Sequence, residues 1–163
     1  MAVSKEAATE IVIERIFDAP RELVWKAWTE PERIMRWWGP NGYTLLACKI
    51  DLRVGGKYLF CMRTPEAQDS WTGGTYREIV PMERIVATEH HADEHGNVLP
   101  PLIDAPEGGL PDVLLVTVTF EDLGGRTKLT LRHAGMPAGE MAGMAAEVWN
   151  QAFDKLAELL ARA

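Results

Sequence analysis

A short helical segment between two stretches of strand-like sequence constrains the fold of this chain most strongly. Residues 17–40 read FDAPRELVWKAWTEPERIMRWWGP. Pro20 suits the first turn of one helix, and residues 29–32 (TEPE) have the pattern of a capping box that opens a second helix. Gly39-Pro40 then ends this second helix, because proline cannot continue it. We predict two short helices here, the first capped by Asp18 and the second by the capping box.

Most of the remaining chain has the alternation of antiparallel strands. The predicted strands cover about 9–17, 43–53, 57–63, 71–80, 85–91, 113–121 and 127–133. A long amphipathic helix over about 138–161 follows and is the obvious cover for their apolar faces. This order predicts an α+β fold in which a curved antiparallel sheet of about seven strands grips the C-terminal helix. We expect one domain over 9–163, after a tail of residues 1–8.

Length and charge restrict the classes of partner. A chain of 163 residues buries a core without staples, and its formal net charge of −7 argues against nucleic acid and anionic membranes. No apolar stretch approaches the ~20 residues of a membrane span. The first ten residues also lack the apolar centre of a signal peptide. We therefore expect a cytoplasmic protein that binds neither nucleic acid nor membrane, with a homodimer left open.

Two cysteines flank a predicted hairpin, and the apolar pattern decides whether they pair. Leu46 and Cys48 share the apolar face of the first strand, and Phe60 lies on that of the second. The two faces coincide only if the loop has an odd length, and residues 54–56 (VGG) suit a three-residue turn. Cys48 then points inward and Cys61 outward, so we predict that no disulfide forms between them.

Several motifs together resemble a known family. They are FDAP (17–20), VWKAWTEPE (24–32), WWGP (37–40), DLRVGG (51–56), GTYREIVPMERI (74–85), VTFED (118–122), GGRTKLTLRH (124–133) and VWNQAFDKLAELL (148–160). In this order they resemble the START-like (SRPBCC) helix-grip superfamily, which includes Bet v 1-type allergens and polyketide cyclases. Within it, the chain is similar to proteins related to the C-terminal domain of the Hsp90 ATPase activator. The resemblance covers almost the whole chain from about residue 9. It implies a helix-grip fold and binding of a small hydrophobic molecule, and it supplies no shared catalytic motif.

The predicted pocket lies between the sheet and the terminal helix. The residues expected to line it are Tyr58, Phe60, Met62, Val116, Val118, Leu131, His133, Met141, Met144 and Val148. Apolar burial would supply affinity, with His133 and Tyr58 orienting the ligand. On the terminal helix, the apolar stripe is expected to pass through Met144, Val148, Ala152 and Leu156, with Trp149 offset from it.

Catalytic and metal chemistry have weaker support in the sequence. His133 is predicted at an inner strand end, where it could act as a general base, with Glu78 as a partner if Tyr76 and Glu78 point inward. Residues 89–95 (EHHADEH) contain zinc-ligand types, but a strand that leaves into a loop does not bring them to one point. We expect no metal and no cofactor, assign no catalytic residue, and favour a binding protein. An acid–base enzyme of the polyketide-cyclase type and a protein that docks on a chaperone or another partner are the alternatives.

Two further features bear on the predicted pocket. The loop over 92–112 is long for a compact domain. Its apolar residues are predicted to pack over the pocket mouth or against a second subunit; they are Leu99, Leu102, Ile103 and Leu110. Trp37 and Trp38 end the second helix, and they either line the pocket or only close the core.

Overall fold

The computed structural model describes residues 8–100, 113–137 and 140–162. Within them, seven strands form one antiparallel sheet in the order β1-β7-β6-β5-β4-β3-β2. The strands are β1 (Ala8–Phe17), β2 (Thr44–Ile50), β3 (Lys57–Arg63), β4 (Asp69–Val80), β5 (Arg84–Ala92), β6 (Leu114–Asp122) and β7 (Thr127–Pro137). The helices are α2 (Arg21–Thr29), α3 (Pro31–Ile34) and α4 (Glu140–Ala161). The predicted α+β helix-grip fold is confirmed.

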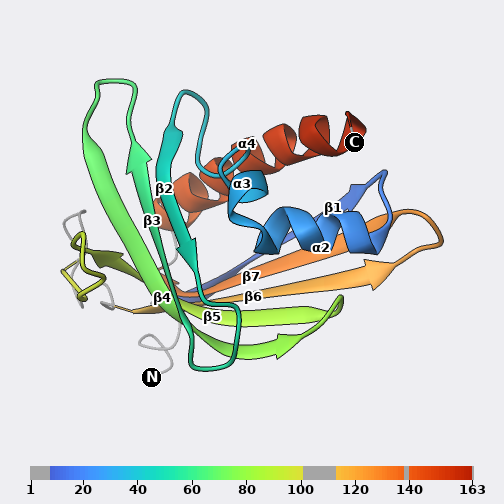
Figure 1. Ribbon diagram of the computed structural model, residues 1–163, viewed down its shortest axis with the longest axis horizontal. Coiled ribbons are helices and arrows are strands. Elements are labelled where there is room, and N and C mark those ends of the chain that lie inside the picture. The colour runs from blue at the N-terminus through green and yellow to red at the C-terminus, as the bar shows by residue number, and fades with distance from the viewer. Residues whose placement is uncertain (1–7, 101–112, 138–139, 163) are drawn as a thin grey trace.

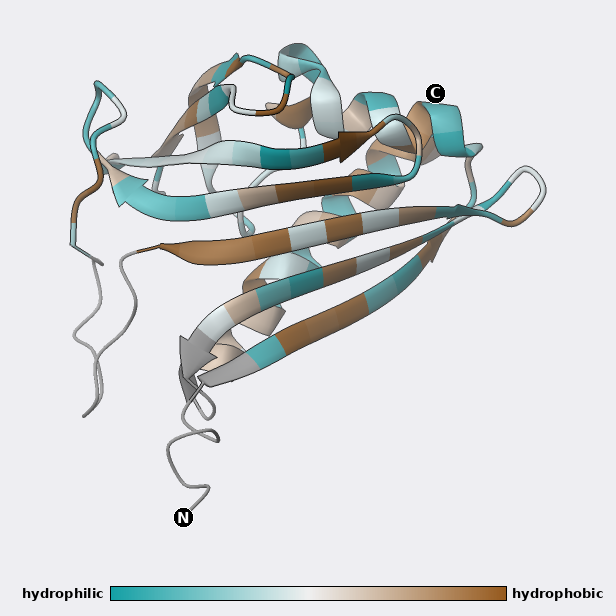
Figure 2. Cartoon of the chain, turned by 90° about the horizontal axis from the view of Figure 1, so that it is seen from below, coloured by the Kyte–Doolittle hydropathy of each residue, from teal (hydrophilic) through white to brown (hydrophobic). Residues whose placement is uncertain are grey.

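The sheet curves around α4, and α2 and α3 lie beside that helix (Figure 1). Apolar and polar residues alternate along several strands, as the two-residue period of a strand with one buried face requires (Figure 2). On β1, where Ile11, Val12 and Ile13 are all apolar, the two-residue period of the strand buries Ile11 and Ile13 and leaves Val12 exposed. The inner face of β1, which its sequence leaves undecided, is therefore the face of Ile11 and Ile13.

The burial of α4 differs from the predicted stripe. Trp149 and Phe153 are buried, together with Ala152, Leu156 and Leu160. Met144 and Val148 are 59% and 41% exposed, so the expectation that they face the sheet is wrong. The helix turns its two aromatic side chains inward because they bury more apolar area than methionine and valine and pack against other rings.

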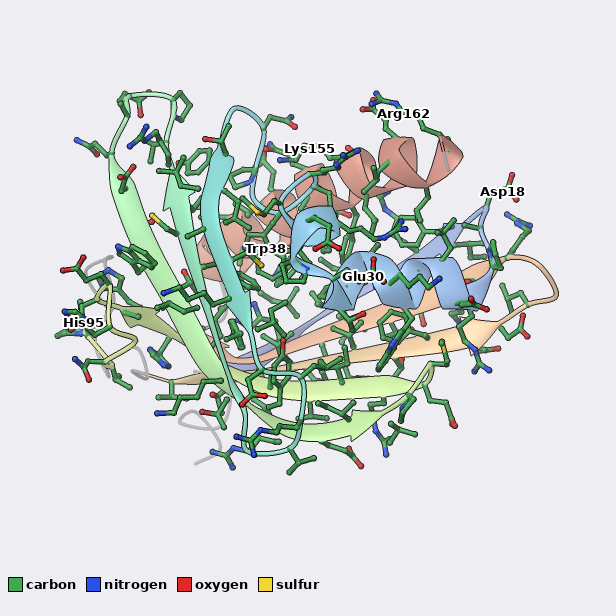
Figure 3. All side chains as sticks on the ribbon, viewed as in Figure 1. Asp18, Glu30, Trp38, His95, Lys155 and Arg162 are labelled. Atoms are coloured by element: carbon green, nitrogen blue, oxygen red, sulfur yellow. The ribbon has the colours of Figure 1, made fainter. Side chains whose placement is uncertain are left out.

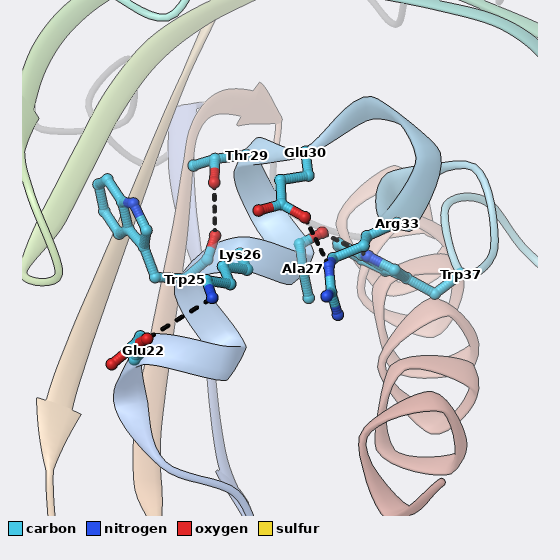
Figure 4. A network of polar contacts seen from close by, with 8 residues as sticks. All are labelled: Glu22, Trp25, Lys26, Ala27, Thr29, Glu30, Arg33 and Trp37. Carbon is cyan, nitrogen blue, oxygen red and sulfur yellow. Dashed lines mark hydrogen bonds and ion pairs between the residues drawn. The ribbon is translucent and has the colours of Figure 1, made fainter. Parts of the chain in front are cut away.

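The helical insert forms as predicted, but by different local contacts. Pro20 and Glu30 precede α2 and α3, and neither helix has a side-chain cap, so the predicted roles of Asp18 and Thr29 are wrong. Thr29 Oγ1 instead donates to the carbonyl oxygen of Trp25 at 2.9 Å, inside the last turn of α2 (Figure 4). α3 is a single turn, and Trp37 anchors the chain after it by donating from Nε1 to the carbonyl oxygen of Ala27 at 2.9 Å. Trp37 is fully buried in the core.

The register of the β2–β3 hairpin agrees with the prediction over most of its length. Cys48 lies opposite Phe60, both cysteines are free, and Val116 lies opposite His133 in the β6–β7 hairpin. A bulge between Leu45 and Ala47 changes the parity of β2. It turns Leu45 inward and leaves Leu46 44% exposed, so the inward prediction for Leu46 is wrong.

Candidate functional site

A small pocket lies between the inner face of the sheet and the helices. Its cavity volume is about 50 Å³. Its walls are Trp28, Ile34, Trp38, Tyr58, Phe60, Tyr76, Ile85, Ala87, Glu89, Val116, Val118 and Trp149. Glu89 supplies the one carboxyl group among these residues, so the pocket is an apolar space with a single acidic side chain in its wall.

The structure brings four of the ten predicted binding residues to this pocket. They are Tyr58, Phe60, Val116 and Val118, which lie on β3 and β6. Leu131 is fully buried in the core and Met62 packs at its edge, and neither lines the pocket. His133 is buried directly behind the wall, in contact with two lining residues.

The predicted residues of the terminal helix do not reach the pocket. Met144 and Val148 are exposed, and the side chain of Met141 lies outside the described residues. Trp149 takes their place in the wall. The predicted loop residues Leu102, Ile103 and Leu110 lie outside the described residues, while Leu99 is half-buried and its backbone N–H donates to the carbonyl oxygen of His91.

Glu89, His133 and Trp149 form a polar cluster at one side of the pocket. His133 Nε2 and Glu89 Oε1 lie 3.0 Å apart, with side-chain exposures of 5% and 20%. Trp149 Nε1 donates to His133 Nδ1 at 3.1 Å. An indole nitrogen only donates, so Nδ1 must accept and carries no proton. The neutral imidazole therefore holds its proton on Nε2, the nitrogen beside Glu89. That N–H is within reach of the carboxylate but not aligned with it, since Nε2 has no hydrogen-bond partner among the described residues.

Glu78 is not the acid beside His133. A bulge between Tyr76 and Glu78 places Tyr76 opposite Ala87, on the pocket side, and Glu78 opposite Val86. Glu78 forms an ion pair with Arg84 at 3.0 Å instead. Tyr76 and Glu78 therefore do not share the inner face, so the condition for a Glu78–His133 pair is not met, and Glu89 on β5 is the acid beside His133.

Tyr58 is held by the backbone of β5. Its hydroxyl donates to the carbonyl oxygen of Thr88 at 2.6 Å. Burial, and then the Glu89 carboxylate beside it, raise the pKa of Tyr58 well above its usual range, so the phenol stays neutral. Because its proton is engaged by the backbone, Tyr58 can offer a ligand only an acceptor. Its predicted orienting role is limited to that.

The aromatic wall contains an unpartnered donor. Trp28 is 8% exposed, and its buried Nε1 has no hydrogen-bond partner among the described residues. Its ring stacks on Trp149, with centroids 6.2 Å apart and planes 20° apart. Trp38 lies half-buried between α3 and the strands (Figure 3), with its centroid 5.0 Å from that of Phe60. Trp38 therefore lines the pocket, whereas Trp37 belongs to the core.

Sequence reasoning left Trp38 open and did not assign seven other residues to the wall: Trp28, Ile34, Tyr76, Ile85, Ala87, Glu89 and Trp149. A signal for Glu89 was available, because Ile85, Ala87 and Glu89 alternate on one face of β5. Trp149 was not assigned because the apolar stripe through Met144 and Val148 on the same helix fits helical spacing equally well. No local pattern in the sequence of α2 shows that the indole nitrogen of Trp28 is left without a partner among the described residues.

The histidine-rich segment 89–95 is divided between the two sides of β5 and the turn that follows. His91 Nδ1 lies 2.9 Å from the carbonyl oxygen of Pro100, and His95 is exposed in the turn (Figure 3). Asp93 accepts from the backbone N–H groups of His95 and Asn97. Within the described ranges, no three metal-ligating side chains gather in one place.

Comparison with known proteins gives the family. The model for Activator of Hsp90 ATPase homolog 1-like (AHSA1) proteins matches residues 18–161. The chain belongs to this family. An AHSA1-like fold is also found in a solved structure from Chromobacterium violaceum, 28% identical, with 93% of this chain and 96% of that chain covered and a TM-score of 0.74. A protein from Arthrobacter aurescens is 27% identical, with 98% and 88% covered and a TM-score of 0.70.

The AHSA1 protein of Silicibacter pomeroyi, at 22% identity, 94% and 98% coverage and a TM-score of 0.74, shares the fold. No curated protein matches the chain. Among the described helices of this AHSA1-like chain, none is long and apolar enough to cross a membrane.

Proposed function

We propose that this AHSA1-like domain binds a small, largely apolar molecule in the pocket between the sheet and α4. The observation that carries the proposal is the composition of the wall: aromatic and aliphatic side chains surround one carboxylate and one indole N–H that has no partner in the described part of the chain. An apolar wall with a few polar groups is typical of small-molecule sites. A buried donor without a partner is costly to the folded protein and gains a hydrogen bond when a ligand supplies an acceptor.

The size of the pocket limits how binding proceeds. A cavity of about 50 Å³ holds only a few water-sized groups, whereas benzene occupies an engineered cavity of about 150 Å³. A ring-sized ligand therefore requires wall side chains to move, and half-buried Trp38 has the most freedom among the three tryptophans of the wall. Binding is expected to change the tryptophan fluorescence strongly, because Trp28, Trp38 and Trp149 all line the space.

The test is to fill the pocket. Ala87→Phe introduces a ring into the wall, and Val86→Phe places the same ring on the opposite face of β5 as a matched control. Small apolar probes should raise the melting temperature and shift the tryptophan emission of the wild type and of Val86→Phe, but not of Ala87→Phe. Native mass spectrometry of protein from its own host should show a co-purifying molecule only where the pocket is open. Equal responses of the two variants would place binding elsewhere and refute the proposal.

The Glu89–His133 pair favours a second candidate, an acid–base enzyme that uses the same pocket. A carboxylate in an apolar wall, backed by an imidazole, is suited to accept a proton from a bound substrate. With a ketone such as acetophenone as a probe, Glu89 would take the proton on the carbon beside the carbonyl group, leaving an enolate that is reprotonated from solvent. In D₂O, NMR would then show deuterium incorporation that Glu89→Gln abolishes and Glu78→Gln retains. Exchange no faster than in buffer would remove the support for this candidate.

A further inference from the structure

The two polar groups of the pocket wall make opposite demands on a ligand. Trp28 Nε1–H is a donor only and is unpartnered among the described residues, so it requires an acceptor. Glu89 is an acceptor when ionised, and its nearest polar neighbour, His133 Nε2–H, is not aligned with it. Both residues line the same cavity of about 50 Å³, so a single small ligand in it meets both side chains.

Charge separates the classes of ligand group that could meet these demands. A carboxylate would accept from Trp28 but would stand beside the Glu89 carboxylate, and no Lys or Arg among the described residues lines the pocket to offset that repulsion. An ammonium group would pair with Glu89 but has no lone pair for Trp28. A purely apolar ligand would leave both groups without a partner. A hydroxyl group can donate to Glu89 and accept from Trp28 at once.

We infer that the ligand of this pocket is an uncharged alcohol or phenol whose hydroxyl group donates to Glu89 and accepts from the indole N–H of Trp28. The inference rests on the proposed function and narrows it, since it excludes fatty acids and other anionic apolar molecules. Tyr58 and Tyr76 do not change the charge of the wall, because burial raises the pKa of both phenols and keeps them neutral.

The experiment uses four probes with one ring and different polar groups: benzyl alcohol, toluene, benzylamine and benzoate. Calorimetry gives their affinities, and ¹H–¹⁵N NMR follows the indole N–H signal of Trp28, assigned by its loss in Trp28→Phe. Benzyl alcohol should bind about tenfold or more tightly than toluene, as expected for a hydrogen bond to a charged group, and should move the Trp28 signal downfield. Benzylamine should bind more weakly than the alcohol, and benzoate should not bind.

Glu89→Gln should reduce the preference for benzyl alcohol over toluene by about tenfold and should allow benzoate to bind. Glu78→Gln, on the outer face of β4, is the matched control and should keep the wild-type ranking. Equal binding of alcohol and toluene, tighter binding of amine or benzoate, or an unmoved Trp28 signal would each overturn the inference while leaving the pocket as a binding site. If Glu89→Gln does not fold, the order of the four probe affinities for the wild type tests the inference by itself. If no probe distinguishes Ala87→Phe from Val86→Phe, the proposed function itself fails.

Discussion

Replacing Gly74 by alanine should destabilise the fold at the base of the pocket. A Cβ atom at Gly74 would lie 2.5 Å from Tyr58 Cε2 and 2.6 Å from Tyr58 Oη, and it would overlap the carbonyl oxygen of Thr88. Tyr58 cannot retreat without losing its 2.6 Å hydrogen bond to that same carbonyl. Thr88 cannot retreat either, because its carbonyl belongs to the backbone of β5. Strands β4 and β5 must therefore shift relative to each other.

The magnitude follows from two contributions. Overpacking in a well-packed core costs about 1–3 kcal/mol, and loss of one buried hydrogen bond costs about 1 kcal/mol more. Gly74→Ala should thus lower the free energy of unfolding by about 2–4 kcal/mol, a large share of the ~5–15 kcal/mol of a typical domain. Gly143→Ala is the matched control, because nothing lies within 4 Å of a Cβ at that exposed position of α4. It should stabilise by about 0.5–1 kcal/mol, since alanine is the better helix former.

Urea unfolding of both variants, followed by tryptophan fluorescence, measures the two changes. A general effect of replacing glycine would have the same sign in both variants, so opposite signs exclude it. A loss below about 1 kcal/mol in Gly74→Ala, or a similar loss in both variants, would show that Tyr58 and Thr88 are not held as tightly as their contacts with Gly74 require.

Four further substitutions test the polar cluster, the half-buried thiol of Cys48 and the orientation of α4. Trp149→Phe removes the donor to Nδ1 of His133 and should lower the free energy of unfolding in urea by about 1–2 kcal/mol. The ¹⁵N NMR spectrum of the imidazole should then show a mixture of the two neutral tautomers. An unchanged spectrum would contradict the tautomer assignment. Burial raises the pKa of Cys48 from about 9 to about 12, so its thiol stays protonated in the folded state where the unfolded chain ionises. Its contribution to stability is thus complete below about pH 9 and falls as the pH rises towards 12. Cys48→Ala should reduce this fall in melting curves, and an equal fall in both proteins would contradict the prediction. In urea unfolding, Phe153→Ala should lower the free energy of unfolding by about 3–5 kcal/mol and Met144→Ser by less than about 0.5 kcal/mol, because only Phe153 is buried. Comparable losses would favour the apolar stripe through Met144 and Val148 as the buried face.

Hairpin registers were predictable from the sequence wherever the two-residue period is unbroken. The opposition of Val116 to His133 follows from the alternation of β6 and β7 and the parity of one turn. The β-bulges on β2 and β4 were not predictable, because the residues around each of them fit either face of the strand; Leu45 and Leu46, for example, are both apolar. Each bulge flips the residues beyond it to the other face, which is why Leu46 and Glu78 point outward instead of inward.

The rotation of α4 had a different origin. The helix carries two overlapping apolar stripes, one that begins at Met144 and Val148 and one that begins at Trp149 and Phe153. Both satisfy helical spacing, so periodicity alone cannot choose between them. The choice depends on the aromatic side chains of the insert, since Trp28 stacks on Trp149 and tilts against Phe153. The helical insert therefore sets which face of α4 is buried.

The polar cluster depends on a property of the whole sheet. Val116 on β6 lies opposite Ala87 on β5 and His133 on β7, so Glu89 must reach His133 across an intervening strand. Neighbouring strands are about 4.8 Å apart, which puts β5 and β7 roughly 10 Å apart along a flat sheet. On the concave side of a curved sheet, inner side chains converge, and here a glutamate and a histidine meet at 3.0 Å. A sequence shows that each residue faces inward, but the curvature that joins them comes from packing around α4. The candidate site is thus a consequence of the grip itself, and variants that flatten the sheet should separate Glu89 from His133 without touching either.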